Sequence, residues 1–251
     1  MNPVHGKFLA RPGAVNVAHV VERCRVLGPG ERFVIWVQGC PLRCPGCHNP
    51  QFLAFRDATW VDVGNLADRV ETVRGIEGVT FVGGEPFAQA RALASLAARL
   101  RDTGLSVMAY SGFTLDQLLA GVAPDALALL NACDLLMDGP YLRGSATQKP
   151  WRGSDNQQLI ALSDRYATEQ IAAWNQPVGQ SFELRVAPDG TLEVLGIPPM
   201  DLVASFPARV SAATGTRPPA SHVSDTSHGK IAERTGGDAT TNNLFKEGTI
   251  P

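Results

Sequence analysis

The chain has 251 residues, 44% of them hydrophobic, and a formal net charge of −2 at pH 7. This length allows one large domain or two small ones, and the near-neutral charge gives no electrostatic basis for binding nucleic acid or an anionic membrane. No apolar run approaches the roughly 18 residues that a membrane span requires. The N-terminal stretch "MNPVHGKFLARPG" lacks the apolar core of a signal peptide, so we expect a cytoplasmic protein with no membrane partner.

The spacing of apolar residues predicts strands and helices in alternation. Strands are expected at residues 14–24, 32–40, 78–86, 105–112 and 134–141. Helices are expected at residues 60–75, 87–104 and 123–133, and in a segment that begins at Thr114 with a capping box completed by Gln117. Strands separated by helices of this length form parallel βαβ units, whose ligands bind beyond the carboxyl ends of the strands. The pattern therefore predicts an α/β fold with a site at that edge of the sheet.

The last quarter of the chain has a different composition. Residues 181–199, "SFELRVAPDGTLEVLGIPP", predict a hairpin with Asp189-Gly190 at its turn, which could close the sheet or shape a substrate site. From Asp201 to Pro251, Leu, Ile, Val and Phe make up only 9 of 51 residues. Such a segment cannot bury enough apolar surface to offset its ordering entropy. We expect one domain at 1–200 and a low-complexity tail at 201–251, disordered over 208–251.

A single loop after a predicted strand holds three of the five cysteines. In "QGCPLRCPGCHNP" (38–50) these are Cys40, Cys44 and Cys47. Three cysteines without an export signal fit a disulfide network poorly, and a structural zinc site normally needs a fourth ligand. The CxxxCxxC spacing favours a [4Fe–4S] cluster held by three thiolates with one iron left open, and zinc is the alternative. The isolated Cys24 and Cys133 are expected to be small core residues.

Further motifs follow other predicted strands, which places them on the same edge of the sheet as the cysteine loop. Together with that loop they resemble the radical S-adenosylmethionine enzymes, and within them the activating enzymes of anaerobic ribonucleotide reductase. The resemblance is carried by an ordered set of motifs: "GPGER" (28–32), "GCPLRCPGCHN" (39–49), "GGEP" (83–86), "YSGF" (110–113), "LLMDGPY" (135–141) and "WRGSDNQ" (151–157). The chain has Gly46 just before its last cysteine, where the superfamily usually has an aromatic residue.

The resemblance implies a parallel sheet of the partial (β/α)-barrel type, with a motif core at 28–160. It implies that Cys40, Cys44 and Cys47 ligate three irons of a [4Fe–4S] cluster, whose open iron chelates the amino and carboxylate groups of S-adenosylmethionine. Gly83 and Gly84 would then let the cofactor approach the backbone, and Glu85 would be the anionic partner of its ammonium group. An ordinary strand-to-helix turn, with Glu85 near a helix N-terminus, is the alternative.

Two further strand ends carry candidate residues. Ser111 would contact the ribose or carboxylate of the cofactor, unless it only caps a local turn. Asp138 would face the cofactor or the substrate peptide, unless it forms an Asx-turn into Gly139. The polar residues of the last motif fit a substrate-facing or partner-facing loop as well as a plain surface loop, and the sequence assigns them no role: Arg152, Ser154, Asn156 and Gln157.

By this resemblance the chain is an activating enzyme. It would cleave S-adenosylmethionine reductively and generate a glycyl radical on a partner protein, an anaerobic ribonucleotide reductase. A low-potential flavodoxin or ferredoxin would supply the electron. The alternatives are a radical S-adenosylmethionine enzyme acting on another peptide or small molecule, and a non-enzymatic zinc module or electron carrier.

Overall fold

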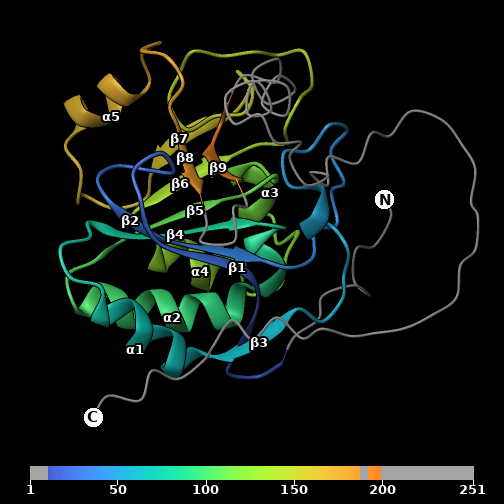
Figure 1. The fold of residues 1–251 in the computed structure, drawn as a ribbon, viewed down its shortest axis with the longest axis vertical. Helices are drawn as coiled ribbons and strands as arrows, with labels where there is room; N and C mark the ends of the chain where they lie inside the picture. The colour runs from blue at the N-terminus through green and yellow to red at the C-terminus, as the bar shows by residue number, and fades with distance from the viewer. Residues whose placement is uncertain (1–10, 187–191, 199–251) are drawn as a thin grey trace, which may run out of the picture. The chain divides into compact units, whose positions relative to one another are not determined.

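The computed structural model describes residues 11–186 and 192–198, which contain a seven-stranded sheet in the order β3-β1-β2-β4-β5-β6-β7 (Figure 1). Its strands are β1 (Ala14–Cys24), β2 (Arg32–Val37), β3 (Thr59–Asp62), β4 (Gly78–Gly83), β5 (Ser106–Tyr110), β6 (Leu135–Asp138) and β7 (Gln158–Ala161). The central strands β2, β4, β5 and β6 run parallel, whereas β1, β3 and β7 pair antiparallel on the two sides. The predicted α/β fold with a parallel core is therefore confirmed, and closure into a partial barrel stays a prediction.

Helices cover one face of this sheet. The helical segments are η1 (Pro50–Phe52), α1 (Val63–Thr72), η2 (Pro86–Gln89), α2 (Ala90–Asp102), α3 (Leu115–Leu119), α4 (Ala126–Ala132) and α5 (Thr168–Trp174). Helices α1, α2 and α4 share an apolar cluster with alternate strand residues such as Val79 and Phe81, which are fully buried. Burial of each such side chain contributes about 1.5–3 kcal/mol. Among the described residues, no helix has both the length and the apolar character to cross a membrane.

Helix ends follow the local sequence signals, with two corrections. The capping box of Thr114 and Gln117 is confirmed at the start of α3. The helix predicted at 60–75 is wrong at its start, because Trp60 and Val61 pair with β1 and Asp62 caps α1 by accepting from the next backbone N–H groups. The helix predicted at 123–133 begins only at Ala126, after a left-handed Asp125.

The segment beyond β7 closes the other face of the sheet. The predicted hairpin is confirmed as β8 (Phe182–Val186) and β9 (Leu192–Gly196), which form a two-stranded sheet of their own and do not extend the main one. Its Leu195 packs in a cluster with Val34 and Trp36, and Glu183 Oε1 accepts from the backbone of Arg25 at 2.6 Å. Helix α5, which the sequence did not predict, packs in a second cluster with Met108. The hairpin turn at Asp189-Gly190 and the predicted tail at 201–251 lie outside the described residues.

A buried arginine holds together the amino ends of the parallel strands. Arg32, in the "GPGER" motif, is 0% exposed, and its five N–H donors find five neutral acceptors. These acceptors are Thr80 Oγ1, Ser106 Oγ and the carbonyl oxygens of Pro29, Val79 and Ser106. Burial lowers the pKa of this guanidinium. Gly28 makes room for it, since a Cβ there would lie 2.7 Å from Arg32 Cδ.

We predict that Arg32→Met lowers the free energy of unfolding by about 2–4 kcal/mol, because buried acceptors lose their partners while the apolar stem is kept. Urea unfolding followed by circular dichroism measures the change. Arg25→Met, at an exposed site of the same segment, should change stability by less than about 0.5 kcal/mol. Equal stability of Arg32→Met and the unaltered protein would contradict a structural role for this side chain.

Candidate metal centre

The cysteine loop begins at the carboxyl end of β2, and its last residues pack against its first. Gly39 N donates to Phe52 O at 2.9 Å and Cys40 N donates to Leu53 O at 3.1 Å, so two backbone bonds close the base of the loop. Gly39 has a φ of +98°, and a Cβ there would lie 2.7 Å from the Phe55 ring. The segment is thus a loop of about a dozen residues whose two ends are hydrogen-bonded to each other next to the sheet.

The three thiols of the loop differ in exposure but lie near one another. Cys40 is 8% exposed, whereas Cys44 and Cys47 are half-buried, and all three are free thiols. Burial raises the pKa of Cys40 to about 11, against backbone N–H groups of Leu42 and Arg43 that lower it. Burial also raises the pKa of Cys47, whose sulfur accepts from Asn49 N at 3.4 Å. The Cys44 thiol adds to the rise of both pKa values, which indicates that the other two thiols lie near it.

This donor set fits an iron–sulfur cluster. Within the described ranges, no three His, Cys, Asp or Glu side chains are grouped closely enough to hold a single metal ion. Backbone N–H groups donate hydrogen bonds to the sulfurs of Cys40 and Cys47, and such bonds tune the potential of cluster thiolates.

The "GGEP" motif packs directly against the root of the cysteine loop. Strands β2 and β4 are parallel neighbours, so Gly83 pairs with Val37 at their common end. Gly84 N donates to Val37 O at 2.7 Å and Glu85 N donates to Gly39 O at 2.8 Å. A Cβ on Gly84 would lie 2.3 Å from Gly39 O, so the backbone of the cysteine loop leaves no room for a side chain at this position.

The Glu85 carboxylate connects this motif to the next strand end. It is 1% exposed and forms the N-cap of η2 by accepting from Phe87 N at 3.0 Å. Its oxygens also accept from Ser111 Oγ at 3.1 Å and from Gly112 N at 2.8 Å. Burial raises the pKa of Glu85 to about 7, although these three donors oppose the rise. Glu85 forms no ion pair among the described residues, so its burial is not compensated by a protein cation.

Asp138, at the carboxyl end of β6, lies on the same edge of the sheet as Glu85 and Ser111. The carboxylate is 3% exposed and accepts from Leu115 N, the first residue of α3, at 2.7 Å. Gly139 N donates to Phe113 O at 3.1 Å, and Ser111 N donates to Met137 O at 2.8 Å. The structure therefore brings Gly83, Gly84, Glu85, Ser111 and Asp138 to one edge of the sheet, on the side where the cysteine loop leaves β2.

The "WRGSDNQ" motif holds the segment after β6 in place. Gln157 Nε2 donates to Gly139 O at 3.0 Å, Asn156 Nδ2 donates to Pro140 O at 2.8 Å, and Ser154 Oγ accepts from Leu142 N at 3.0 Å. Arg152 is buried and donates to Pro150 O, Gln157 O, Trp174 O and Asn175 Oδ1. Most of the polar groups of these four residues therefore bind the chain's own backbone, and Arg152 also binds the Asn175 side chain.

The sequence did not single out Tyr141, which joins that segment to the cysteine loop. Its ring lies 4.8 Å from the His48 ring, centroid to centroid. A Cβ on Gly46 would meet Tyr141 at 3.7 Å, and one on Gly153 would meet it at 3.1 Å. Tyr141 therefore packs beside the position just before the last cysteine, where the chain has glycine. The signal in the sequence was the pairing of that glycine with an aromatic residue at the end of "MDGPY".

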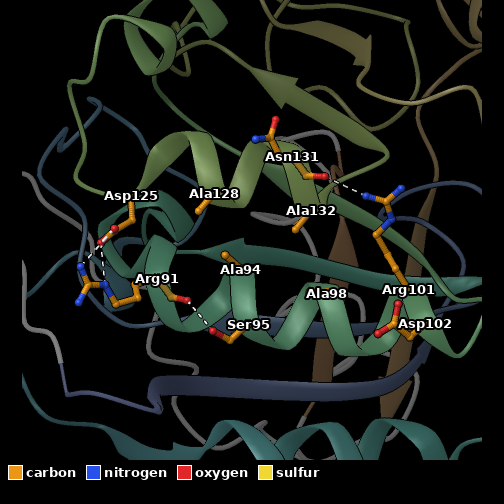
Figure 2. Close-up of a pocket in the computed structure, with 10 residues that line it drawn as sticks. All are labelled: Arg91, Ala94, Ser95, Ala98, Arg101, Asp102, Asp125, Ala128, Asn131 and Ala132. Atoms are coloured by element: carbon orange, nitrogen blue, oxygen red, sulfur yellow. Dashed lines mark hydrogen bonds and ion pairs between the residues drawn. The ribbon is translucent and has the colours of Figure 1, made fainter.

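A separate cavity lies away from these residues. It is an open groove of about 720 Å³ between α2 and α4. Figure 2 shows the side chains of Ala94, Ala98, Ala128 and Ala132 between the two helices. Arg91 and Asp125 form an ion pair at one end, and Arg101 donates to Asn131 O at the other. No thiol or motif residue lines it, so this cavity is not part of the candidate metal centre.

The model of the 4Fe-4S single cluster domain family matches residues 26–160, which is more than half of the chain. The chain belongs to this family. The anaerobic ribonucleoside-triphosphate reductase-activating protein of enterobacteria phage T4 is 32% identical over 55% of this chain and 89% of its own length. The pyruvate formate-lyase-activating enzyme of Staphylococcus aureus is 34% identical over 35% of this chain and 38% of its own length. The resemblance to radical S-adenosylmethionine activating enzymes is thereby confirmed.

Among solved structures, QueE from Escherichia coli aligns with 40% of this chain and 53% of its own, at 17% identity and a TM-score of 0.33. A TM-score this low supports no statement about the fold. The sequence relationship and the geometry of the strand ends therefore carry the conclusions that follow.

We predict that Tyr141→Ala speeds the loss of the cluster to a chelator by roughly fivefold, because an aromatic contact of about 1 kcal/mol is removed beside the third cysteine. Tyr141→Phe keeps the ring and should behave like the unaltered protein. The decay of cluster absorbance after addition of chelator under anaerobic conditions measures the rate. If Tyr141→Ala retains the cluster as long as Tyr141→Phe, the ring does not support the loop.

Proposed function

We propose that the chain is an activating enzyme that cleaves S-adenosylmethionine reductively and generates a glycyl radical on a partner protein, an anaerobic ribonucleotide reductase. One observation carries the proposal: the cysteine loop, the "GGEP" motif and the "YSGF" motif are joined by direct hydrogen bonds at one edge of the sheet. Membership of the 4Fe-4S single cluster family and the likeness to reductase-activating proteins support it.

In this proposal Cys40, Cys44 and Cys47 are the ligands of a [4Fe–4S] cluster. With S-adenosylmethionine bound, the reduced cluster supplies the electron that splits the cofactor into methionine and a 5′-deoxyadenosyl radical. Gly83 and Gly84 offer backbone groups to the amino acid end of the cofactor. The zinc alternative predicts no bound sulfide and no cofactor cleavage.

Glu85 is proposed as the partner of the cofactor's ammonium group. A carboxylate has roughly four acceptor positions, and the three hydrogen bonds to Glu85 leave capacity unused. A cation beside it would offset the cost of burying the charge. Ser111 and Asp138 sit on the same edge, and we propose that Ser111 contacts the cofactor and that Asp138 faces the cofactor or the substrate peptide.

The runner-up is a radical S-adenosylmethionine enzyme that acts on another glycyl-radical enzyme, peptide or small molecule. The observation that favours it is the segment after residue 160, because α5 and the β8–β9 hairpin lie beyond the matched family region. A glycyl radical doublet in the electron paramagnetic resonance spectrum of a matched ribonucleotide reductase would decide for the first proposal. Cofactor cleavage without that doublet would decide for the runner-up.

We predict that the anaerobically reconstituted protein binds about four irons and four sulfides per chain. Cys40→Ala, Cys44→Ala and Cys47→Ala should each abolish the cluster. Cys24→Ala and Cys133→Ala are matched controls that should keep it, because burial raises the pKa of both thiols and they lie outside the loop. Iron and sulfide analysis measures the content, and stoichiometric zinc without sulfide in the native protein would overturn the assignment.

We predict that Glu85→Gln keeps the cluster and weakens binding of S-adenosylmethionine by roughly ten- to a hundredfold, as expected for loss of a charge-assisted hydrogen bond of about 1.5–3 kcal/mol. Ser111→Ala removes one hydrogen bond to Glu85 and the proposed contact of Ser111 with the cofactor, but it leaves the Glu85 charge, so its effect on affinity should be smaller than that of Glu85→Gln. Titration of the reduced protein with S-adenosylmethionine, followed by electron paramagnetic resonance, measures both. Equal affinities of Glu85→Gln and the unaltered protein would rule out the ionic contact.

A further inference from the structure

The exposed part of the cysteine loop and the segment after β6 form one surface, which we call the basic face. Arg43, Pro45 and Gly46 come from the cysteine loop, and Leu142 and Arg143 come from the segment after β6. A Cβ on Gly46 would lie 3.3 Å from Arg143 Cδ, so the stem of that arginine rests on the loop between the second and third cysteines. The two segments are therefore held together as a single surface.

The charge of this surface has one sign. Residues 32–56 and 139–154 contain no Asp or Glu. Within the part of the chain that the structure describes, neither Arg43 nor Arg143 has a carboxylate partner, whereas Lys149 in the same segment is paired with Asp155 at 3.0 Å. Leu142 is 47% exposed, which adds an apolar contact beside the two guanidinium groups. Basic residues around an exposed apolar side chain are suited to a protein partner with an acidic surface.

The basic face includes exposed residues that lie between two of the proposed cluster ligands. Cys40 is buried and its loop root contacts Gly84 and Glu85, which we assign to the cofactor side. Cys44 is half-buried, and Pro45 and Gly46, which separate it from the last cysteine, are exposed. A substrate glycine must reach the cofactor side, whereas an electron donor needs only to approach a cluster ligand. The exposed residues beside Cys44 meet the requirement of an electron donor.

We propose that the basic face docks an acidic, low-potential electron-transfer protein. The step transfers one electron: the donor's reduced cofactor is oxidised by one electron, and the cluster is reduced by one. The inference rests on the proposed function, because only a redox-active cluster needs such a donor. Arg43 and Arg143 then act by attracting and orienting the donor, and they take no part in the chemistry.

The experiment compares binding of an acidic bacterial flavodoxin to the cluster-loaded protein and to the double variant Arg43→Glu/Arg143→Glu. We expect the dissociation constant to rise roughly tenfold or more at low salt, with the difference shrinking as salt screens the charges. The matched control is Arg74→Glu/Arg165→Glu, which makes the same charge change at exposed residues near the amino ends of β4 and β5. It should leave flavodoxin binding within about twofold of the unaltered protein.

Reduction by dithionite separates this inference from the proposed function. The double variant should still take up an electron from dithionite and cleave S-adenosylmethionine, because a small reductant does not need the docking surface. If dithionite-reduced unaltered protein cannot cleave the cofactor, the proposed function fails while the binding comparison still decides the docking surface. Charge reversal could disturb the loop itself, so the neutral variant Arg43→Gln/Arg143→Gln tests the same contact. It should weaken flavodoxin binding by roughly threefold or more at low salt.

Three results would overturn the proposal. The first is unchanged flavodoxin binding in both the reversed and the neutral variants. The second is an equal loss in the control, which would show that only net charge matters. The third concerns the double variant Arg43→Glu/Arg143→Glu. If it loses binding to a matched reductase but still binds flavodoxin, the basic face belongs to the substrate protein.

Discussion

The close backbone approach between Gly39 and Gly84 is the contact on which the rest of the site depends. Gly39 O accepts from Glu85 N, and a Cβ on Gly84 would collide with it at 2.3 Å. Because β2 and β4 are parallel neighbours, this contact joins two motifs that are more than forty residues apart in the chain. Glu85 then carries the connection to Ser111 and Gly112, and Ser111 N continues it to Met137 O on β6. The edge of the sheet is thus one hydrogen-bonded unit.

Two buried ionisable side chains at opposite ends of the parallel strands differ in how fully their polar groups are paired. Arg32 matches five donors with five acceptors, so its hydrogen-bonding capacity is used within the protein. Glu85 is equally buried but has acceptor capacity left and no protein cation beside it. Burial raises the pKa of Glu85 to about 7, which is the cost of holding an unpaired carboxylate there. A cationic ligand would remove that cost, and a proton would also do so.

The sequence predicted the parts of the site that depend on strand ends and spacing, because buried parallel strands and their terminal glycines leave a local pattern. It did not predict Tyr141 or the role of Arg152, since both act through contacts with segments distant in the chain. Edge strand β3 was also missed, because Trp60 and Val61 fit a helical spacing equally well and only pairing with β1 decides between the two. Gly46 was recognised as unusual, but the ring beside it comes from another motif.

The segment beyond the family region packs against one face of the sheet. Leu195 of the hairpin lies in a cluster with Val34 and Trp36, and α5 packs in the same cluster as Met108, on the face without α1, α2 and α4. Helices cover the opposite face. In the proposed function, a glycine-bearing segment of the partner would approach Glu85 and Ser111 along the carboxyl edge of the strands, where both residues lie. In the proposal above, an electron donor would meet the same edge at the basic face, beside the cysteine loop.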